Sequence, residues 1–212
     1  MRFLFLLIFA TSALAQGPEA ISVLERRLIA LDAAEMPPGP ELRLSLAYLD
    51  QSGWTAESIT AAAVESARIL SQCGVQLKTM ELIRVAAPVR YRDFLTPVSR
   101  ELAAALQLSK PTVYFVAGTR QRPAFDAEAI GRGNSRSRPE LSDTVWITRS
   151  TRDLGVAMTH ELVHVIMDSG EHSEEAGNLM RDETAPGNTR LSEGQCQRLR
   201  TVGTANGLLR IR

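Results

Sequence analysis

The most constraining feature of this sequence is the segment of residues 158–172, MTHELVHVIMDSGEH, which holds all three histidines of the chain. His160 and His164 are four residues apart, and on an α-helix this spacing projects both imidazoles from one face, one turn apart. Two imidazoles in this relation can bind one zinc ion. Glu161 follows His160 directly, so it would lie beside the metal and could take a proton from a bound water.

The remainder of this predicted helix is apolar on nearly every face, which is typical of a buried helix. Buried imidazoles and a buried carboxylate need polar partners, and a metal ion supplies them to the whole group at once. The competing interpretation is a pair of core histidines that are satisfied without a metal. Residues 150–153, STRD, have the form of a capping box and predict that the helix begins there.

A third ligand is required, because a catalytic zinc ion normally has three protein ligands and leaves its fourth position to water. His172 is the remaining histidine, and Gly170 is suited to ending the helix and turning the chain back toward the metal. The sequence therefore favours His172. A carboxylate can replace the third histidine in related sites, so nearby acids remain alternatives: Asp168, Glu171, Glu174 and Glu175.

Around this helix, predicted strands alternate with predicted helices from Glu41 onward. This alternation predicts a single α/β or α+β sheet domain. Strands are expected at residues 42–49, 75–85, 111–117 and 144–148, with a short edge strand at 129–134. Helices are expected from Thr55 to about Gly74 and from Thr96 to about Leu108.

The first residues have the features of a secretory signal peptide at residues 1–15: Arg2, an apolar run over residues 3–10 and a small-residue ending at Ala15. A membrane anchor is the alternative, but roughly 18 continuous apolar residues are needed to span a bilayer, and this run breaks at residues 11–12. No cysteine follows Ala15, which argues against a lipoprotein. The predicted destination is therefore the periplasm or the extracellular space.

Residues 16–40 are expected to form an N-terminal amphipathic helix and a Pro-rich linker. Ile21, Leu24, Leu28 and Leu31 recur at helical spacing, and the prolines at residues 37–40 would then end the helix. A helix packed on the outside of the domain is the simpler interpretation, and a short propeptide is the alternative. The main domain is predicted to span residues 41–212.

Charge and cysteine content limit the possible partners and compartments. Removing Arg2 with the signal leaves 23 basic and 24 acidic residues, a net charge of −1, so nothing indicates nucleic acid or a membrane surface as a partner. Cys73 and Cys196 are the only cysteines, and in an oxidising compartment such a pair is usually a disulfide. Two buried free thiols are the alternative.

These motifs resemble the metzincin clan of zinc metallopeptidases. His160-Glu161-x-x-His164, the downstream His172 and the segment Asn178-Leu179-Met180 are similar to the helix, third histidine and methionine-containing turn of that clan. Residues 191–200 are similar to the start of the C-terminal helix in matrixin-like bacterial members. One departure is clear, because the clan has six residues from the second to the third histidine and this chain has eight.

The resemblance implies an α+β fold: a mixed twisted sheet with backing helices, an active-site helix and a small C-terminal helical subdomain. It implies that residues 129–134 line the cleft, where an extended peptide could pair as an added strand. It also implies that Met180 lies beneath the metal as an apolar floor without binding it.

The sequence therefore predicts a secreted or periplasmic zinc-dependent endopeptidase that acts on polypeptides as a monomer. His160, His164 and His172 would hold Zn²⁺, and Glu161 would be the general base. One alternative is a binding or scaffold protein with a structural zinc site, which would be closed by a fourth protein ligand. The other is a metal-free module that binds a partner.

Overall fold

The computed structural model describes residues 20–31, 39–121, 129–133 and 138–211 of the chain. The predicted signal peptide, residues 1–15, lies outside the described residues, so it stays a prediction. Pro37 and Pro38 of the predicted linker also lie outside the described residues. Among the described residues, no helix is long and apolar enough to cross a membrane.

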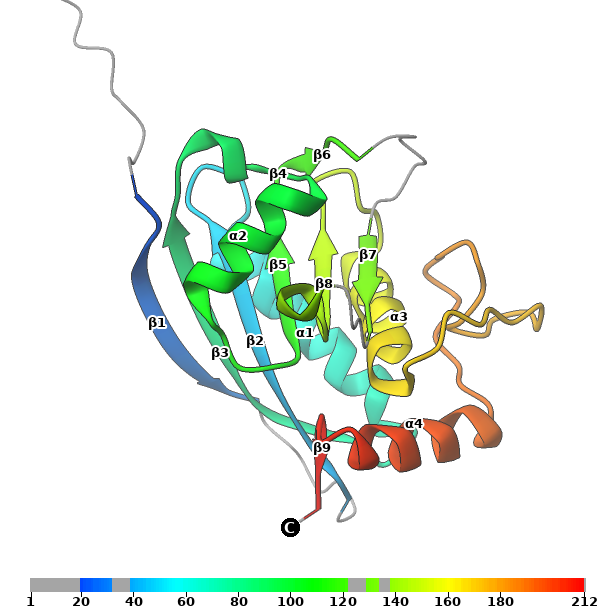
Figure 1. Cartoon of the computed structure of the whole chain (residues 1–212). Helices are drawn as coiled ribbons and strands as arrows, with labels where there is room; N and C mark the ends of the chain where they lie inside the picture. Colours follow the sequence, from blue (N-terminus) through cyan, green and yellow to red (C-terminus); the bar gives the residue numbers. More distant parts are fainter. Residues whose placement is uncertain (1–19, 32–38, 122–128, 134–137, 212) are drawn as a thin grey trace, which may run out of the picture.

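A mixed sheet forms the centre of the molecule, with its strands in the order β1-β3-β2-β5-β8-β7 (Figure 1). The four inner strands run parallel to one another, whereas each edge strand, β1 and β7, runs antiparallel to the strand beside it. The bounds along the chain are β1 (Ser22–Ala30), β2 (Glu41–Leu49), β3 (Gln76–Ala86), β5 (Thr112–Phe115), β7 (Ala129–Arg132) and β8 (Thr144–Ile147). The short β9 (Leu209–Arg210) pairs with β2, while β4 (Asp93–Phe94) and β6 (Gly118–Thr119) form a separate pair.

Helices cover both faces of this sheet, because its inner strands are apolar on both sides. In β5, Val113 and Phe115 belong to one core and Tyr114 to the other, where it stacks on Trp146. The first core is completed by α1 (Ala56–Ser71), α3 (Leu154–Met167) and α4 (Glu193–Ala205). The second is covered by α2 (Thr96–Leu106) and the 3-10 turns η1 (Val89–Tyr91) and η2 (Pro139–Leu141). The predicted α+β fold with a mixed sheet and backing helices is confirmed.

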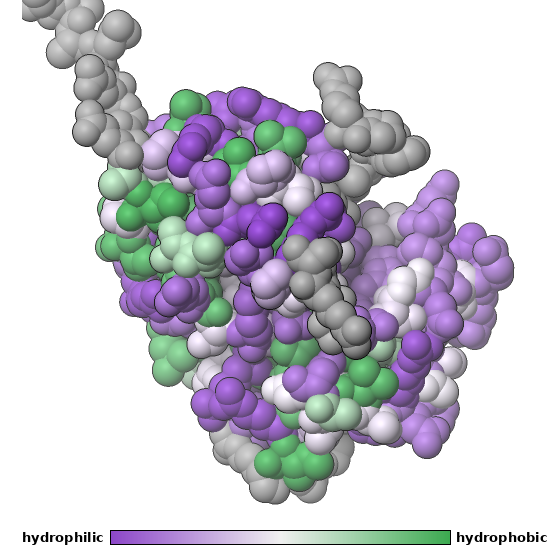
Figure 2. All heavy atoms as spheres, in the orientation of Figure 1, coloured by the Kyte–Doolittle hydropathy of each residue, from purple (hydrophilic) through white to green (hydrophobic). Residues whose placement is uncertain are grey.

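The predicted N-terminal helix is wrong, because residues 22–30 form the edge strand β1. This strand pairs with β3 from Ser22 opposite Ala86 to Ala30 opposite Thr79. Leu24 and Leu28 are 46% and 77% exposed, so their helical spacing marks no buried stripe. Figure 2 shows apolar groups at the surface on the side where β1 lies.

The physical reason is that the free edge of β3 offers a row of backbone partners to the incoming chain. A β-ladder satisfies backbone groups whatever the spacing of apolar side chains, so tertiary pairing overrides a weak local preference. Side-chain pairs across the ladder reinforce it, with Arg26 2.9 Å from Glu81. The strand therefore belongs to the sheet, whereas the sequence placed it outside the domain.

A disulfide joins Cys73 to Cys196, as predicted, across 123 residues of sequence. Both cysteines are buried in the first core. Cys73 follows the end of α1, and Cys196 lies in the first turn of α4. The bond therefore fastens the C-terminal helix to the helix that covers the sheet.

Candidate metal centre

The helix α3 carries the two predicted histidines and Glu161, and it lies directly against α1. A Cβ atom added at Gly155 would lie 2.6 Å from Cβ of Glu65 on α1, so only glycine permits this approach. Further along, the buried Thr159 hydroxyl donates a hydrogen bond to Oγ of Ser66 at 2.9 Å. His160 is therefore held in the interior, only 3% exposed.

The start of α3 differs from the prediction, because residues 150–153 do not form a capping box. The N-cap residue is Asp153, which has a positive φ of 48° and makes no side-chain cap hydrogen bond. The Ser150 hydroxyl is instead 2.8 Å from that of Thr148. A local pairing of two hydroxyls before the helix thus replaces the predicted cap.

The end of α3 is set by Asp168, not by Gly170 as predicted. Asp168 adopts the left-handed conformation at φ 47°, which is tolerated by Asp because its short polar side chain makes local hydrogen bonds. The following residue, Ser169, then donates its N–H to the His164 carbonyl at 3.1 Å. Its own carbonyl accepts from Nδ1 of His164 at 2.7 Å.

His172 comes from the loop that follows α3, and three contacts fix this loop. The Ser173 N–H donates to the Met180 carbonyl at 2.7 Å. Glu171 pairs with Arg198 of α4 at 2.5 Å. Nδ1 of His172 is 3.5 Å from Oδ1 of Asp182. The eight-residue spacing to His172 is thus accommodated by a loop that is tied to α4.

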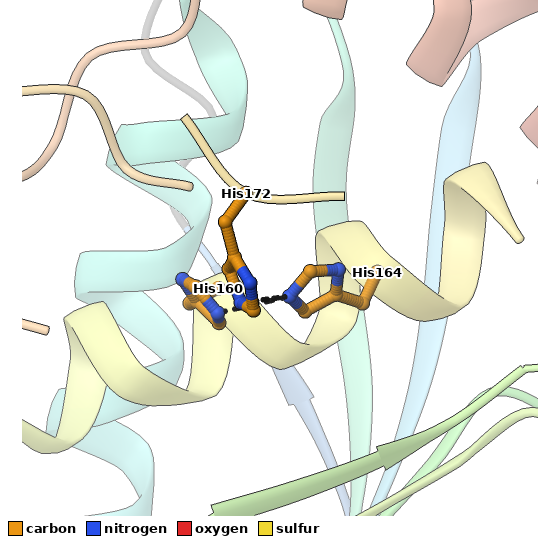
Figure 3. Close-up of side chains that lie close together, drawn as sticks. All are labelled: His160, His164 and His172. Carbon is orange, nitrogen blue, oxygen red and sulfur yellow. Dashed lines mark hydrogen bonds between the residues drawn. The ribbon is translucent and has the colours of Figure 1, made fainter. Parts of the chain in front are cut away.

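The three imidazoles converge on one point, as Figure 3 shows. Nε2 of His164 is 2.9 Å from Nε2 of His160 and 3.2 Å from Nε2 of His172. One nitrogen from each ring lies within 4.8 Å of the others. Nitrogens that bind one zinc ion at about 2.0–2.1 Å can be no more than about 4 Å apart, so two of the spacings already suit a shared ion.

The hydrogen bonds of the Nδ1 atoms decide the tautomer of each ring, and so whether its Nε2 can bind a metal. Nδ1 of His160 lies 2.8 Å from the Leu179 carbonyl, and Nδ1 of His164 contacts the Ser169 carbonyl. A carbonyl only accepts, so both Nδ1 atoms carry the proton and both Nε2 atoms present lone pairs. Lone pairs that point at one another repel, and a cation between them removes the repulsion.

Burial favours the neutral form of His160 and His164, and the neutral form is the one that binds metals. Burial lowers the pKa of His160 below its usual value. Burial and then the neighbouring His160 lower the pKa of His164 to about 4. The donor set, its spacing and its protonation therefore suit a divalent ion such as zinc.

Glu161 lies between α3 and the edge strand β7. The Gly131 N–H of β7 donates a hydrogen bond to its carboxylate, and burial raises its pKa to about 7 despite that bond and the nearby Arg132. A Cβ atom added at Gly131 would lie 2.5 Å from Oε2 of Glu161, so glycine is required for this approach. The edge strand predicted for residues 129–134 thus contacts the candidate base.

Met180 is buried in the first core, 1% exposed, which agrees with an apolar role. Its neighbour Leu179 supplies the carbonyl that accepts from His160. The turn predicted at Asn178-Leu179-Met180 therefore contacts the cluster through its backbone.

Sequence reasoning missed the partners that surround the histidines. Leu179 and Ser169 act through main-chain carbonyls, for which a side-chain pattern contains no signal. Among the described residues, the group that could hold a metal consists of the three histidines. The acids proposed as alternative ligands are not in it; Glu171, for example, pairs with Arg198.

Comparisons with known proteins agree with this geometry at the level of fold. The structure is similar to a crystal structure of metalloproteinase-II from Bacteroides fragilis, with a TM-score of 0.55 and 18% sequence identity. The match covers 80% of this chain and 55% of that one, so this chain spans about half the length of that protein. No protein-family model and no curated protein sequence matches the chain. The fold is therefore similar to that of a metalloproteinase, and the three converging histidines are compatible with a bound metal ion.

Proposed function

We propose that this chain is an exported zinc-dependent endopeptidase in which His160, His164 and His172 hold the ion. The observation that carries the proposal is the convergence of three Nε2 atoms at the buried helix that also carries Glu161. The similarity to a Bacteroides metalloproteinase supports the reaction class. The disulfide and the signal-like residues 1–15 support export.

Bound zinc would polarise the scissile carbonyl and lower the pKa of a water to about 7. Glu161 would take the proton from that water and return it to the leaving amine. Its hydrogen bond to Gly131 holds one side of the carboxylate on β7. β7 is the last strand of the sheet, and an extended polypeptide substrate could pair with its outer edge.

A structural zinc site is the second candidate, and the number of ligands argues against it. Structural zinc is almost always bound by four protein ligands, whereas the group found among the described residues has three. A catalytic ion needs the fourth position for water. Metal analysis that finds about one zinc per chain would agree with both candidates, and activity separates them.

The test of the catalytic role is Glu161→Gln. The three histidines remain, so zinc should stay bound at one per chain, while hydrolysis of casein should fall by at least about 100-fold because the base is lost. His160→Ala is the comparison variant: it removes a proposed metal ligand, so it should lose the zinc ion as well as the activity. Undiminished casein hydrolysis by Glu161→Gln would show that Glu161 is not the base.

A further inference from the structure

One buried polar side chain near the cluster has no place in the mechanism above. Asn178 is 2% exposed, and both the donor and the acceptor groups of its amide form hydrogen bonds. Its Nδ2 donates to Oε1 of Gln195 at 2.9 Å and to Oε2 of Glu175 at 3.4 Å. Its Oδ1 accepts from Nε2 of Gln195 at 3.2 Å and from the Met180 N–H at 2.9 Å.

The hydrogen bond to the Met180 N–H also affects the carbonyl of Leu179. The Met180 N–H and the Leu179 carbonyl belong to one planar unit, so fixing the direction of the N–H fixes the direction of the carbonyl. Oδ1 of Asn178 accepts the N–H, and the carbonyl accepts from Nδ1 of His160 at 2.8 Å. The Asn178 amide thereby aims the group that orients His160.

Gln195 holds Asn178 from a rigid element. It lies in the first turn of α4, where its Oε1 also accepts the Ser192 N–H at 2.8 Å and completes a capping box. The next residue, Cys196, is bonded to Cys73 at the end of α1. The position of Asn178 is therefore set by two helices joined by a disulfide.

We propose that Asn178, held by Gln195, is a positioning residue for the metal site that fixes the orientation and tautomer of His160 through the Leu179–Met180 peptide. The proposal rests on the proposed zinc function. Residues that orient a metal ligand typically contribute about 10- to 100-fold in metal affinity. Asn178 contacts neither metal nor substrate in this scheme, so its loss should act on binding of the ion.

The experiment compares zinc affinity by competition with a chromophoric chelator in the full mature chain. Asn178→Ala should bind zinc at least about 10-fold more weakly than the parent. When Co²⁺ replaces zinc, the visible spectrum of this variant should be shifted relative to that of the parent. The control is Asn188→Ala, in the same loop, whose amide donates to the Glu183 carbonyl at 2.9 Å; it should bind zinc like the parent.

A second pair keeps the proposal testable if Asn178→Ala does not fold. Gln195→Ala and Ser192→Ala each remove the capping box of α4, but only Gln195→Ala also removes the partner of Asn178. Gln195→Ala should lose several-fold more zinc affinity than Ser192→Ala. Equal affinities in this pair, or in Asn178→Ala and Asn188→Ala, would overturn the proposal. A parent chain that binds no zinc would instead overturn the proposed function itself.

Discussion

At the scale of single residues, the candidate site depends on backbone carbonyls as much as on side chains. His160 and His164 each donate from Nδ1 to a carbonyl, which leaves Nε2 of both rings as a ligand. His172 is less enclosed, and its Nδ1 faces the exposed Asp182 at 3.5 Å. The rings of the two helix histidines are therefore already oriented to bind a metal ion, whereas the position of His172 depends on its loop.

The identity of the third ligand is tested by alanine substitutions in that loop. His172→Ala should lower zinc affinity by several orders of magnitude, because a converging imidazole is lost. Glu174→Ala and Glu175→Ala should stay near the parent, since neither carboxylate belongs to the cluster. Zinc affinity is measured by chelator competition, and the reverse ranking would indicate a site of two histidines and one glutamate.

Lys110 provides a residue-scale prediction that is independent of the metal. Burial lowers its pKa to about 8 from the usual 10.5, although Asp143 opposes the shift. Between these two pH values the unfolded chain holds a proton that the folded chain has lost, so this group makes folding more favourable as pH rises. Below about pH 8 both states are charged, and burial of the charge opposes folding.

Replacing this lysine should change the pH dependence of stability accordingly. The free energy of unfolding of Lys110→Met, minus that of the parent, should be largest at pH 7 and should shrink as pH rises from about 8 to 10.5. Urea unfolding at several pH values measures the difference. A difference that stays constant over this window would show that Lys110 titrates normally in the folded chain.

At the scale of elements, the contact between α3 and the edge strand β7 decides where the candidate base lies. Gly131 and Gly133 both approach α3, and added Cβ atoms would lie 2.5 Å from Oε2 of Glu161 and 2.7 Å from Oδ1 of Asp168. Strand interiors usually avoid glycine, because it is flexible and packs poorly. Here the missing side chains let two carboxylates reach the strand.

Gly131→Ala tests this contact. The methyl group would displace the Glu161 carboxylate, so kcat for a peptide substrate should fall by about 10-fold or more, while zinc affinity should stay near the parent. Gly187→Ala is the matched control, since nothing lies within 4 Å of a Cβ added there. Parental kcat in Gly131→Ala would show that the strand does not position the base.

At the scale of the whole molecule, the disulfide fastens α4 to α1, and α4 in turn holds the loop that carries His172. Two side-chain contacts make this second link, Gln195 to Asn178 and Arg198 to Glu171. Closing a loop of 123 residues is worth about 5 kcal/mol in the chain-entropy model. This is a large share of the 5–15 kcal/mol that is typical, to order of magnitude, of a whole domain.

Reduction of the disulfide should therefore lower Tm strongly without removing a ligand. Melting curves of the oxidised protein with and without reductant measure the effect, and the double variant Cys73→Ser, Cys196→Ser should melt like the reduced parent. A thiol titration of the denatured, unreduced protein should find no free thiol. Two free thiols per chain would contradict both the disulfide and the proposed oxidising compartment.

The sequence by itself determined those features that depend on short stretches of chain. The spacing of His160 and His164 predicts a shared helical face, because helix geometry is local. The inner strands were predicted from short stretches of chain, such as the apolar–polar alternation of residues 42–49 and the apolar run of residues 111–117. The helix expected from Thr55 does begin there, with Thr55 as the cap of α1. Ser192 and Gln195 form a capping box at the start of α4, within residues 191–200, which resemble the start of a C-terminal helix.

Tertiary structure alone decided the features that depend on distant segments. Residues 22–30 became a strand because β3 offers an unpaired edge, which no local pattern reveals. The contact of Glu161 with Gly131 and the hold of Gln195 on Asn178 join residues far apart in sequence. Such contacts depend on how the helices pack on the sheet. The residue types therefore predicted a metal site, whereas packing decided which groups orient its ligands.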